Sequence, residues 1–167
     1  MTEFRVTVPG EPVTKGSMRG YFRGGKLVLT NDNPATRPWE LAVAWAAAAE
    51  KARSGWRMLD RDVPAEVDLM FYLPRPSSLP KRVLYPVRKR DLDKLTRAIK
   101  DALKVAGVYR DDGQVTDDVI RKRFAGGVGD PSGPDGTMRV EVVVRPLAAI
   151  SPGIEGVATQ NLTIDSR

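Results

Sequence analysis

One amphipathic helix, set between two strand-like segments, constrains the fold of this chain more than any other feature. Apolar residues recur every three or four positions from Leu92 to Ala106, which predicts a helix with one buried face, and Gly107 then supplies a stop. An alternating apolar segment precedes the helix at 65–73, and a strand-like segment follows it at 114–124. The helix is therefore predicted to be a crossover that packs on a sheet.

Aspartates stand at both ends of this helix, and two interpretations of them are open. Asp91 falls at the start of the helix, Asp93 lies two residues on, and Asp112 comes after the helix. In one interpretation Asp91 caps the helix and the acids pair with nearby cations, since Arg97 is four residues from both Asp93 and Asp101. In the other, the chain returns Asp112 to Asp91 and Asp93. Two carboxylates about 4 Å apart repel by roughly 4 kcal/mol at an effective dielectric near 20, so a cation or a raised pKa has to compensate, and a divalent metal is the simpler answer.

The residue types that the chain lacks decide which metal such a site could hold. There is no histidine and no cysteine. Their absence excludes zinc sites built from nitrogen and sulfur ligands, as well as Ser-His-Asp and Cys-His nucleophile systems. Ligation by oxygen alone indicates magnesium, with manganese as the alternative.

The charge of the chain favours a polyanionic partner. The formal net charge is +6, which suits nucleic acid or an anionic membrane surface. Many of the cations lie directly before or beside the acids, namely Lys81, Arg82, Arg88, Lys89, Arg90, Lys94, Arg97 and Lys100. Phosphodiester chemistry requires a phosphate-attracting surface next to a metal site. With no membrane span and no signal peptide in the sequence, we expect an intracellular, cytoplasmic protein without a membrane partner.

Patterned segments on either side of the helix complete one domain. Strands are predicted at 3–8, 65–73, 114–124 and 138–144, a glycine-turned hairpin over 21–29, and an alanine-rich helix at 39–53. Charged residues within 114–124 favour the edge of the sheet, and we expect this strand to pair antiparallel with 138–144. The proline-rich, basic segment 74–90 is predicted to be a mobile loop.

The order of these elements predicts the fold class and the domain boundaries. We expect an α/β (α+β) fold with a mixed β-sheet and two main helices packed on it, forming a single domain over 1–146. Residues 147–167 show neither a period nor enough apolar content to require order, and are predicted to be a flexible C-terminal tail.

The residues at both ends of the central helix match a known pattern in order, spacing and type. Asp91-Leu-Asp-Lys-Leu is followed by Arg97, by Asp101-Ala-Leu and a glycine, and by Asp111-Asp112-x-Gln114-Val115. This pattern resembles the signature of the RusA family of Holliday-junction resolvases over about thirty positions. The family's asparagine is Lys94 here, and its functional lysine falls on Arg97, which keeps the charge without the titratable proton.

The N-terminal segment carries a second resemblance, to phage-type members of the same family. These often have Gly-x-Pro-x-x-Lys-Gly followed by arginines, a pattern that Lys15 and Arg19 match while Ser17 stands where an arginine is expected. A basic turn without a substrate contact is the alternative for this segment. The two resemblances together cover roughly residues 6 to 144.

The resemblance implies a function and a set of site residues. It implies a Mg²⁺-dependent, structure-selective endodeoxyribonuclease that resolves four-way junctions by paired phosphodiester hydrolysis in DNA recombination and repair. The phage-type resemblance further implies a protein that is encoded by a phage and acts in a bacterial host. Asp91, Asp93 and Asp112 would be catalytic metal ligands, and Arg97 would stabilise charge on the phosphate. The DNA contacts would be Lys15, Arg19, Arg88, Lys89, Arg90 and Lys94. The alternative is a non-catalytic nucleic-acid-binding protein whose acids only cap a helix and form salt bridges.

The proposed substrate also predicts an assembly. A four-way junction has approximate two-fold symmetry and is cut on two strands, whereas one chain supplies a single group of acids. We therefore expect a homodimer that binds branched DNA. Its interface is expected at the sheet edges and on the apolar side of the 39–53 helix.

Overall fold

The computed structural model describes residues 3–31, 33–88 and 90–147. The predicted flexible tail lies almost wholly outside this range, and Lys89 lies outside it as well. In chain order the elements are β1 (Phe4–Pro9), β2 (Met18–Arg23), β3 (Lys26–Asn31), α1 (Thr36–Ser54), β4 (Ala65–Leu73), α2 (Leu92–Val105), the 3-10 turn η1 (Asp112–Gln114), β5 (Val115–Phe124), the 3-10 turn η2 (Gly133–Asp135) and β6 (Arg139–Pro146). None of the helices in the described residues is long and apolar enough to cross a membrane.

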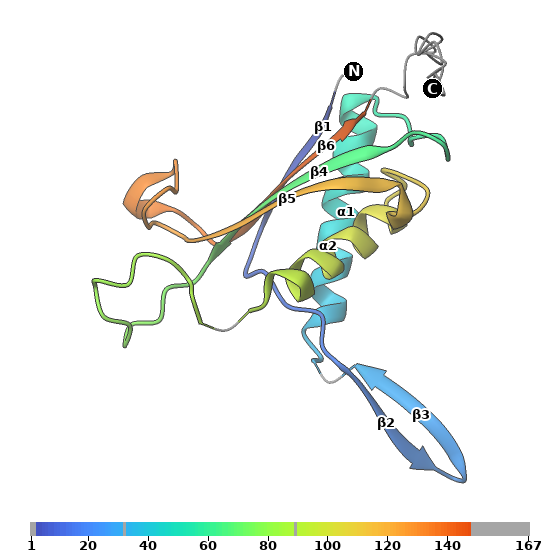
Figure 1. Cartoon of the computed structure of the whole chain (residues 1–167), viewed down its shortest axis with the longest axis horizontal. Helices are drawn as coiled ribbons and strands as arrows, with labels where there is room; N and C mark the ends of the chain where they lie inside the picture. The colour runs from blue at the N-terminus through green and yellow to red at the C-terminus, as the bar shows by residue number, and fades with distance from the viewer. Residues whose placement is uncertain (1–2, 32, 89, 148–167) are drawn as a thin grey trace, which may run out of the picture.

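Four strands form one mixed sheet in the order β1-β6-β4-β5. β6 runs antiparallel to both β1 and β4, while β5 runs parallel to β4, with α2 as the crossover between them (Figure 1). The predicted single domain of mixed sheet and two helices is confirmed. β5 lies at the edge of the sheet, as its charged residues indicated.

The predicted antiparallel pair of 114–124 with 138–144 is wrong, because β4 lies between β5 and β6. A strand that follows a helical crossover returns parallel to the strand before the helix, and this places β5 beside β4. The valines of β6, at 140, 142 and 144, are buried and suit an interior strand. Sequence periodicity identified both strands but not their neighbours.

Alternation along the strands separates a core face from a charged face. Val67, Leu69 and Phe71 of β4 are fully buried on the side where both helices pack (Figure 1). On the opposite side, Asp68 of β4 accepts hydrogen bonds from Arg121 of β5 at 2.7 and 2.8 Å. One face of the sheet therefore forms the core with α1 and α2, and the other meets solvent through ion pairs.

The hairpin of β2 and β3 projects from the body of the protein (Figure 1). Gly24 and Gly25 form its turn with φ of 57° and 76°, a left-handed conformation that glycine adopts without strain. Arg19 lies in β2 opposite Thr30, and its side chain is outside the described part of the structure. The predicted hairpin is confirmed, and it extends three residues further toward the N-terminus than its pattern indicated.

Candidate active site

The first two aspartates of the predicted site stand free at the start of α2. Asp91 is the N-cap residue with extended backbone (φ −61°, ψ 136°), but its carboxylate makes no capping hydrogen bond. Asp93 lies in the first turn and is exposed. Among the described residues, neither carboxylate has a hydrogen bond or an ion pair. Helix capping by the Asp91 side chain, which one interpretation of the sequence required, does not occur.

Arg97 lies one turn further along α2 and is likewise exposed without a partner among the described residues. Among the described residues, the salt bridges expected from its four-residue spacing to Asp93 and Asp101 are not formed, and Asp101 pairs with Lys15. Lys94, where the family has asparagine, reaches Ser17 with its Nζ 3.4 Å from the hydroxyl oxygen. Two carboxylates and one guanidinium on the first half of one helix are thus exposed and have no oppositely charged partner within the described part of the chain.

The N-terminal segment that carries Lys15 wraps this end of α2. The Lys15 backbone N–H donates to the carbonyl of Lys94 at 3.0 Å, and its ammonium bonds Asp101 and lies 3.8 Å from Glu40. Lys15 is predicted to contact DNA, and in the free protein it ties the N-terminal segment to both helices.

Arg90, directly before α2, also binds the N-terminal segment. Its guanidinium donates to the Pro12 carbonyl and to the Glu11 carboxylate, and its backbone has φ 58°, an unusual value for a residue other than glycine. Arg88 differs, because it is exposed and has no partner in the described structure. Of the three cations predicted at 88–90 to bind DNA, Arg88 is the one that the structure leaves available, and Lys89 lies outside the described residues.

The third aspartate, Asp112, begins the turn η1 beyond the other end of α2. Gln114 holds this turn in place: its amide nitrogen donates to the carbonyls of Asp60 (2.7 Å) and Val63 (3.0 Å). Its amide oxygen accepts from the backbone N–H groups of Arg110 (2.8 Å) and Asp111 (3.1 Å). The buried Gln114 side chain is therefore the clamp that positions Asp112. The role of this glutamine was not predicted, although it belongs to the Asp-Asp-x-Gln-Val motif.

Lys104, in the last turn of α2, neutralises Asp111 and Asp112 at the turn η1. Its ammonium lies 2.7 Å from the Asp111 carboxylate and 3.7 Å from that of Asp112. The hydrogen bond from Lys104, followed by that from the Gly113 N–H, lowers the pKa of Asp111 to about 2. Burial, together with the surrounding carboxylates, raises the pKa of Tyr109 well above its ordinary value. Tyr109 therefore stays a neutral phenol, which donates to the Lys100 carbonyl at 3.1 Å.

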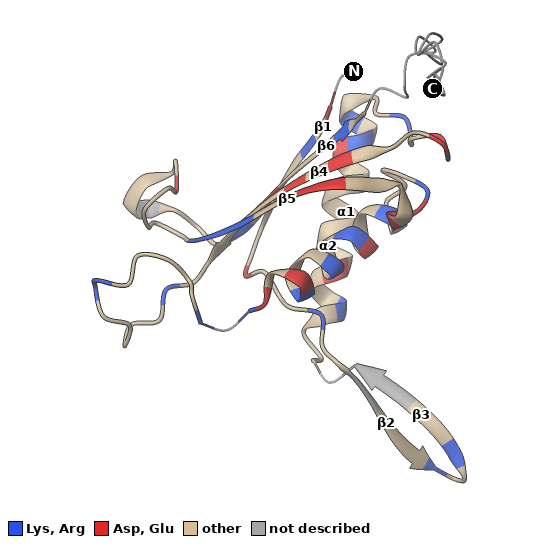
Figure 2. Ribbon diagram, in the orientation of Figure 1, with Lys and Arg blue, Asp and Glu red and all other residues tan. Residues whose placement is uncertain are grey.

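The length of α2 separates Asp112 from the other two aspartates. The helix has 14 residues, which corresponds to about 20 Å. Figure 2 shows acidic residues at both ends of it. In the part of the chain that the structure describes, no three acidic side chains are close enough together to hold a metal ion. The convergence of all three aspartates within one chain is wrong, because a crossover helix lies along the sheet and its ends meet opposite ends of the strands.

Basic residues gather at the end of the sheet where α2 begins. They lie in the loop 74–90 and at the end of β5, beside the start of α2 (Figure 2). The Lys122 ammonium joins the two regions by donating to the Arg90 carbonyl at 3.1 Å. The carboxylates of Asp91 and Asp93, which lack a partner in the described structure, therefore border a positively charged surface, and such a surface attracts phosphates.

Comparisons with known proteins identify the family of this chain. Residues 9–145 match the model of a family described as endodeoxyribonuclease RusA. The chain is also 30% identical over 155 residues to an uncharacterized protein, YqaN of Bacillus subtilis (strain 168), in an alignment that covers 87% of this chain and 97% of that protein. The chain thus belongs to the RusA family of endodeoxyribonucleases, the nucleases that resolve Holliday junctions.

Proposed function

We propose that this protein cuts four-way DNA junctions on two strands, that Mg²⁺ or, as an alternative, Mn²⁺ serves the reaction, and that the active form is a homodimer. RusA nucleases depend on a divalent metal. The observation that carries the proposal is the pair of exposed carboxylates of Asp91 and Asp93, which have no partner among the described residues, with Arg97, likewise without a described partner, one turn away. Because the substrate is DNA, we propose that the protein acts in the cytoplasm of a bacterial host.

One chain does not complete the metal site, and this supports a dimer. Asp91 and Asp93 provide two oxygen ligands, but Asp112 lies beyond the far end of α2. If two copies of α2 lie side by side and antiparallel about a two-fold axis, each Asp112 comes to the Asp91 end of the other helix. In that arrangement three carboxylates would meet at one site, and oxygen ligands of this kind suit a divalent metal.

The sequence of β5 suits such a two-fold contact. Its outer edge has no neighbouring strand in the described structure. Asp117 and Asp118 occupy its first half and Arg121, Lys122 and Arg123 its second half. If two copies of β5 pair antiparallel, the acidic half of each strand faces the basic half of the other, and opposite charges across a strand pair are stabilising. The same pairing would set the two α2 helices antiparallel on one side of the joined sheet.

When bound, a divalent metal supplies a nucleophilic oxygen at neutral pH and polarises the scissile phosphate. Asp91 and Asp93 would hold it without first losing a cationic partner, since they have none among the described residues. Arg97 would place a positive charge near the phosphate. Arg88 would hold the DNA backbone, so recognition depends on the shape of the branch more than on base sequence.

The non-catalytic alternative loses its main support in the structure. It requires Asp91 to cap the helix and Asp93 to pair with Arg97, and in the described residues neither interaction is formed. Structural ion pairs do occur nearby, between Lys15 and Asp101 and between Lys100 and Asp118. Cations are thus available to this surface, yet Asp91 and Asp93 remain without them.

Cleavage of a synthetic four-way junction, with and without Mg²⁺, tests the proposal. Asp93→Asn should lower cleavage by about a hundredfold or more while junction binding persists, because a metal ligand is lost and no positive charge is removed. Glu50→Gln is the control: it removes a carboxylate near the end of α1, where an exposed pair with Arg53 contributes little. Equal cleavage by the Asp93→Asn variant and the control would contradict the assignment.

A further inference from the structure

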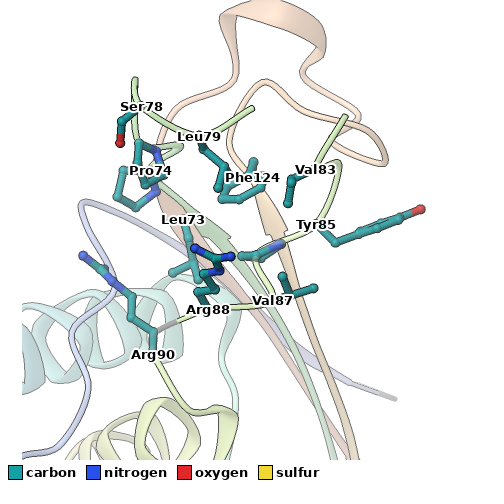
Figure 3. A pocket seen from close by; sticks show the side chains of 12 residues that line it. Leu73, Pro74, Ser78, Leu79, Val83, Tyr85, Val87, Arg88, Arg90 and Phe124 are labelled. Atoms are coloured by element: carbon teal, nitrogen blue, oxygen red, sulfur yellow. The ribbon is translucent and has the colours of Figure 1, made fainter. Parts of the chain in front are cut away.

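A cavity of about 410 Å³ lies beneath the proline-rich loop that joins β4 to α2. Its walls are mostly apolar. Figure 3 shows Leu79, Val83 and Phe124 gathered on one side, with Arg88 on the opposite side. The volume falls within the range of about 300–1,000 Å³ that is typical of pockets for small ligands or parts of larger ones.

Arg75 connects separate parts of the loop that covers this cavity. Its guanidinium donates to the carbonyls of Val83 (2.6 Å) and Pro80 (2.9 Å) and lies 5.0 Å from the centre of the Phe124 ring. Arg123 lies at the same distance from the ring of Tyr85. The described residues of the loop form no helix or strand, as predicted, and these contacts connect it to β5 and to itself, while its mobility stays a prediction. The cavity is therefore present before any ligand arrives.

The charges around the cavity favour an anionic ligand with an apolar part. No acidic residue is among the described residues that line it. Of its two arginines, Arg90 turns away to Glu11 and Pro12, whereas Arg88 is exposed and unpaired in the described structure. Apolar and aromatic walls beside a free guanidinium match a nucleobase with its adjoining phosphate.

The position of the cavity relates it to the proposed cleavage site. Arg88 and Arg90 line the cavity, and Asp91 follows Arg90 directly at the start of α2. A strand of DNA that passes the carboxylates would therefore also pass the mouth of the cavity. A base inside a duplex cannot enter without losing its stacking and pairing, at a cost of a few kcal/mol, and this cost is least where stacking is already interrupted.

We propose that this cavity receives one unstacked nucleobase from the strand that passes Asp91, with Arg88 on the adjoining phosphate. The inference rests on the proposed function and deepens it. It assigns to the loop a means of selecting branched over fully paired DNA, because a branch point offers a base at little cost and a duplex does not.

The test measures binding in EDTA, so that no strand is cut. A series of four-way junctions carries one abasic nucleotide at each position flanking the branch in turn. Wild type should bind one member of the series roughly tenfold more weakly than the intact junction, because the stacked base is missing. Leu79→Trp, which fills the cavity, should bind that member and the intact junction equally. Leu84→Trp is the matched control, since Leu84 lies on the same loop but is 47% exposed and outside the cavity.

A second filling variant protects the test against misfolding. In the Ser78→Trp variant the indole replaces an exposed residue at the cavity lining, and no apolar lining side chain is removed. This variant should also lose the preference for the intact base. The inference is overturned if wild-type affinity is unchanged by removal of any of the bases, which is the result expected if the cavity holds a protein side chain instead. It is also overturned if both filling variants keep the same base preference as the control. Cleavage of the intact junction by wild type with Mg²⁺ is scored separately. Its absence would overturn the proposed function, whereas normal cleavage without base preference would overturn only this inference.

Discussion

Gln114→Glu is the substitution that most sharply tests how the turn η1 is held. The amide nitrogen of Gln114 donates to the carbonyls of Asp60 and Val63 at 2.7 and 3.0 Å, and its oxygen accepts two backbone N–H bonds. The change to glutamate keeps the accepting oxygen but replaces both donors with a negatively charged acceptor. Two hydrogen bonds worth about 1 kcal/mol each are lost and two carbonyls then face a carboxylate, so the cost is about 2–4 kcal/mol. The melting temperature should fall by roughly 5–12 °C.

Urea unfolding at neutral pH measures this cost. The pKa of a carboxyl held against two carbonyl oxygens is raised above that of an ordinary glutamate, so its neutral form fits the site better. The stability deficit relative to wild type should therefore be full at neutral pH and shrink as the pH falls through that raised pKa. Thr116→Val, two residues away at an exposed position, should change stability by less than about 0.5 kcal/mol. A Gln114→Glu variant as stable as wild type would refute the clamp.

Three further predictions concern a buried ion pair and two cations. Hydrogen bonds from Arg139, and then from two backbone N–H groups, hold the pKa of buried Asp130 well below its ordinary range. The ionised Asp130 therefore stabilises the fold above its unfolded-state pKa, and this stabilisation is lost as the pH falls toward the folded-state pKa. Asp130→Asn should cost about 3 kcal/mol at pH 7 by urea unfolding, and equal stability there would contradict the buried pair. Arg97→Ala should lower kcat for junction cleavage about a hundredfold with Arg97→Lys restoring most of it, and an unchanged kcat in the alanine variant would remove Arg97 from the site. Arg88→Ala should weaken binding to all DNA substrates and reduce the slope of log K against log salt by about 1, whereas an unaltered slope would show that Arg88 meets no phosphate.

Local patterns in the sequence predicted the elements well. β4 spans Ala65–Leu73, as the alternation indicated, and α2 spans Leu92–Val105, one residue short of the predicted stripe. Each pattern shows which side chains of one helix or strand face the core, and residues close together in the sequence are enough to establish it. The edge position of β5 could also be predicted, since Asp117 and Arg121 would be costly inside a sheet.

Contacts between distant segments could not be predicted in the same way. The order of the strands is an example: β4 lies between β5 and β6, and no local pattern within β5 identifies which strand is its neighbour. Charge in the sequence likewise does not identify its partner: Lys15 has Asp101 and Arg90 has Glu11 in the folded chain. Their roles on DNA remain predictions. The ion pairs do not exclude such roles, since a cation that is paired in the free protein can exchange its partner for a phosphate on binding.

The motif indicates Asp91, Asp93 and Asp112 as site residues, an assignment that stays a prediction. Their spacing in the sequence gave no distance through space. Once α2 is seen to lie along the sheet, the third carboxylate is about a helix length away from the other two. The clamp by Gln114 depends on carbonyls more than fifty residues earlier in the chain, which no local pattern reveals.

A mixture of two inactive variants tests the central claim, that the site is completed by a second chain. Asp93→Asn and Asp112→Asn are each expected to be inactive. If Asp112 serves the partner chain, a heterodimer of the two variants contains one site with every aspartate intact and one site with both substitutions. Mixed and allowed to exchange, the variants should regain nicking of a four-way junction at about one quarter of the wild-type number of sites, since about half of the dimers are mixed. If each site lies within one chain, every site in the mixture carries a substitution, and the mixture would stay as inactive as either variant alone.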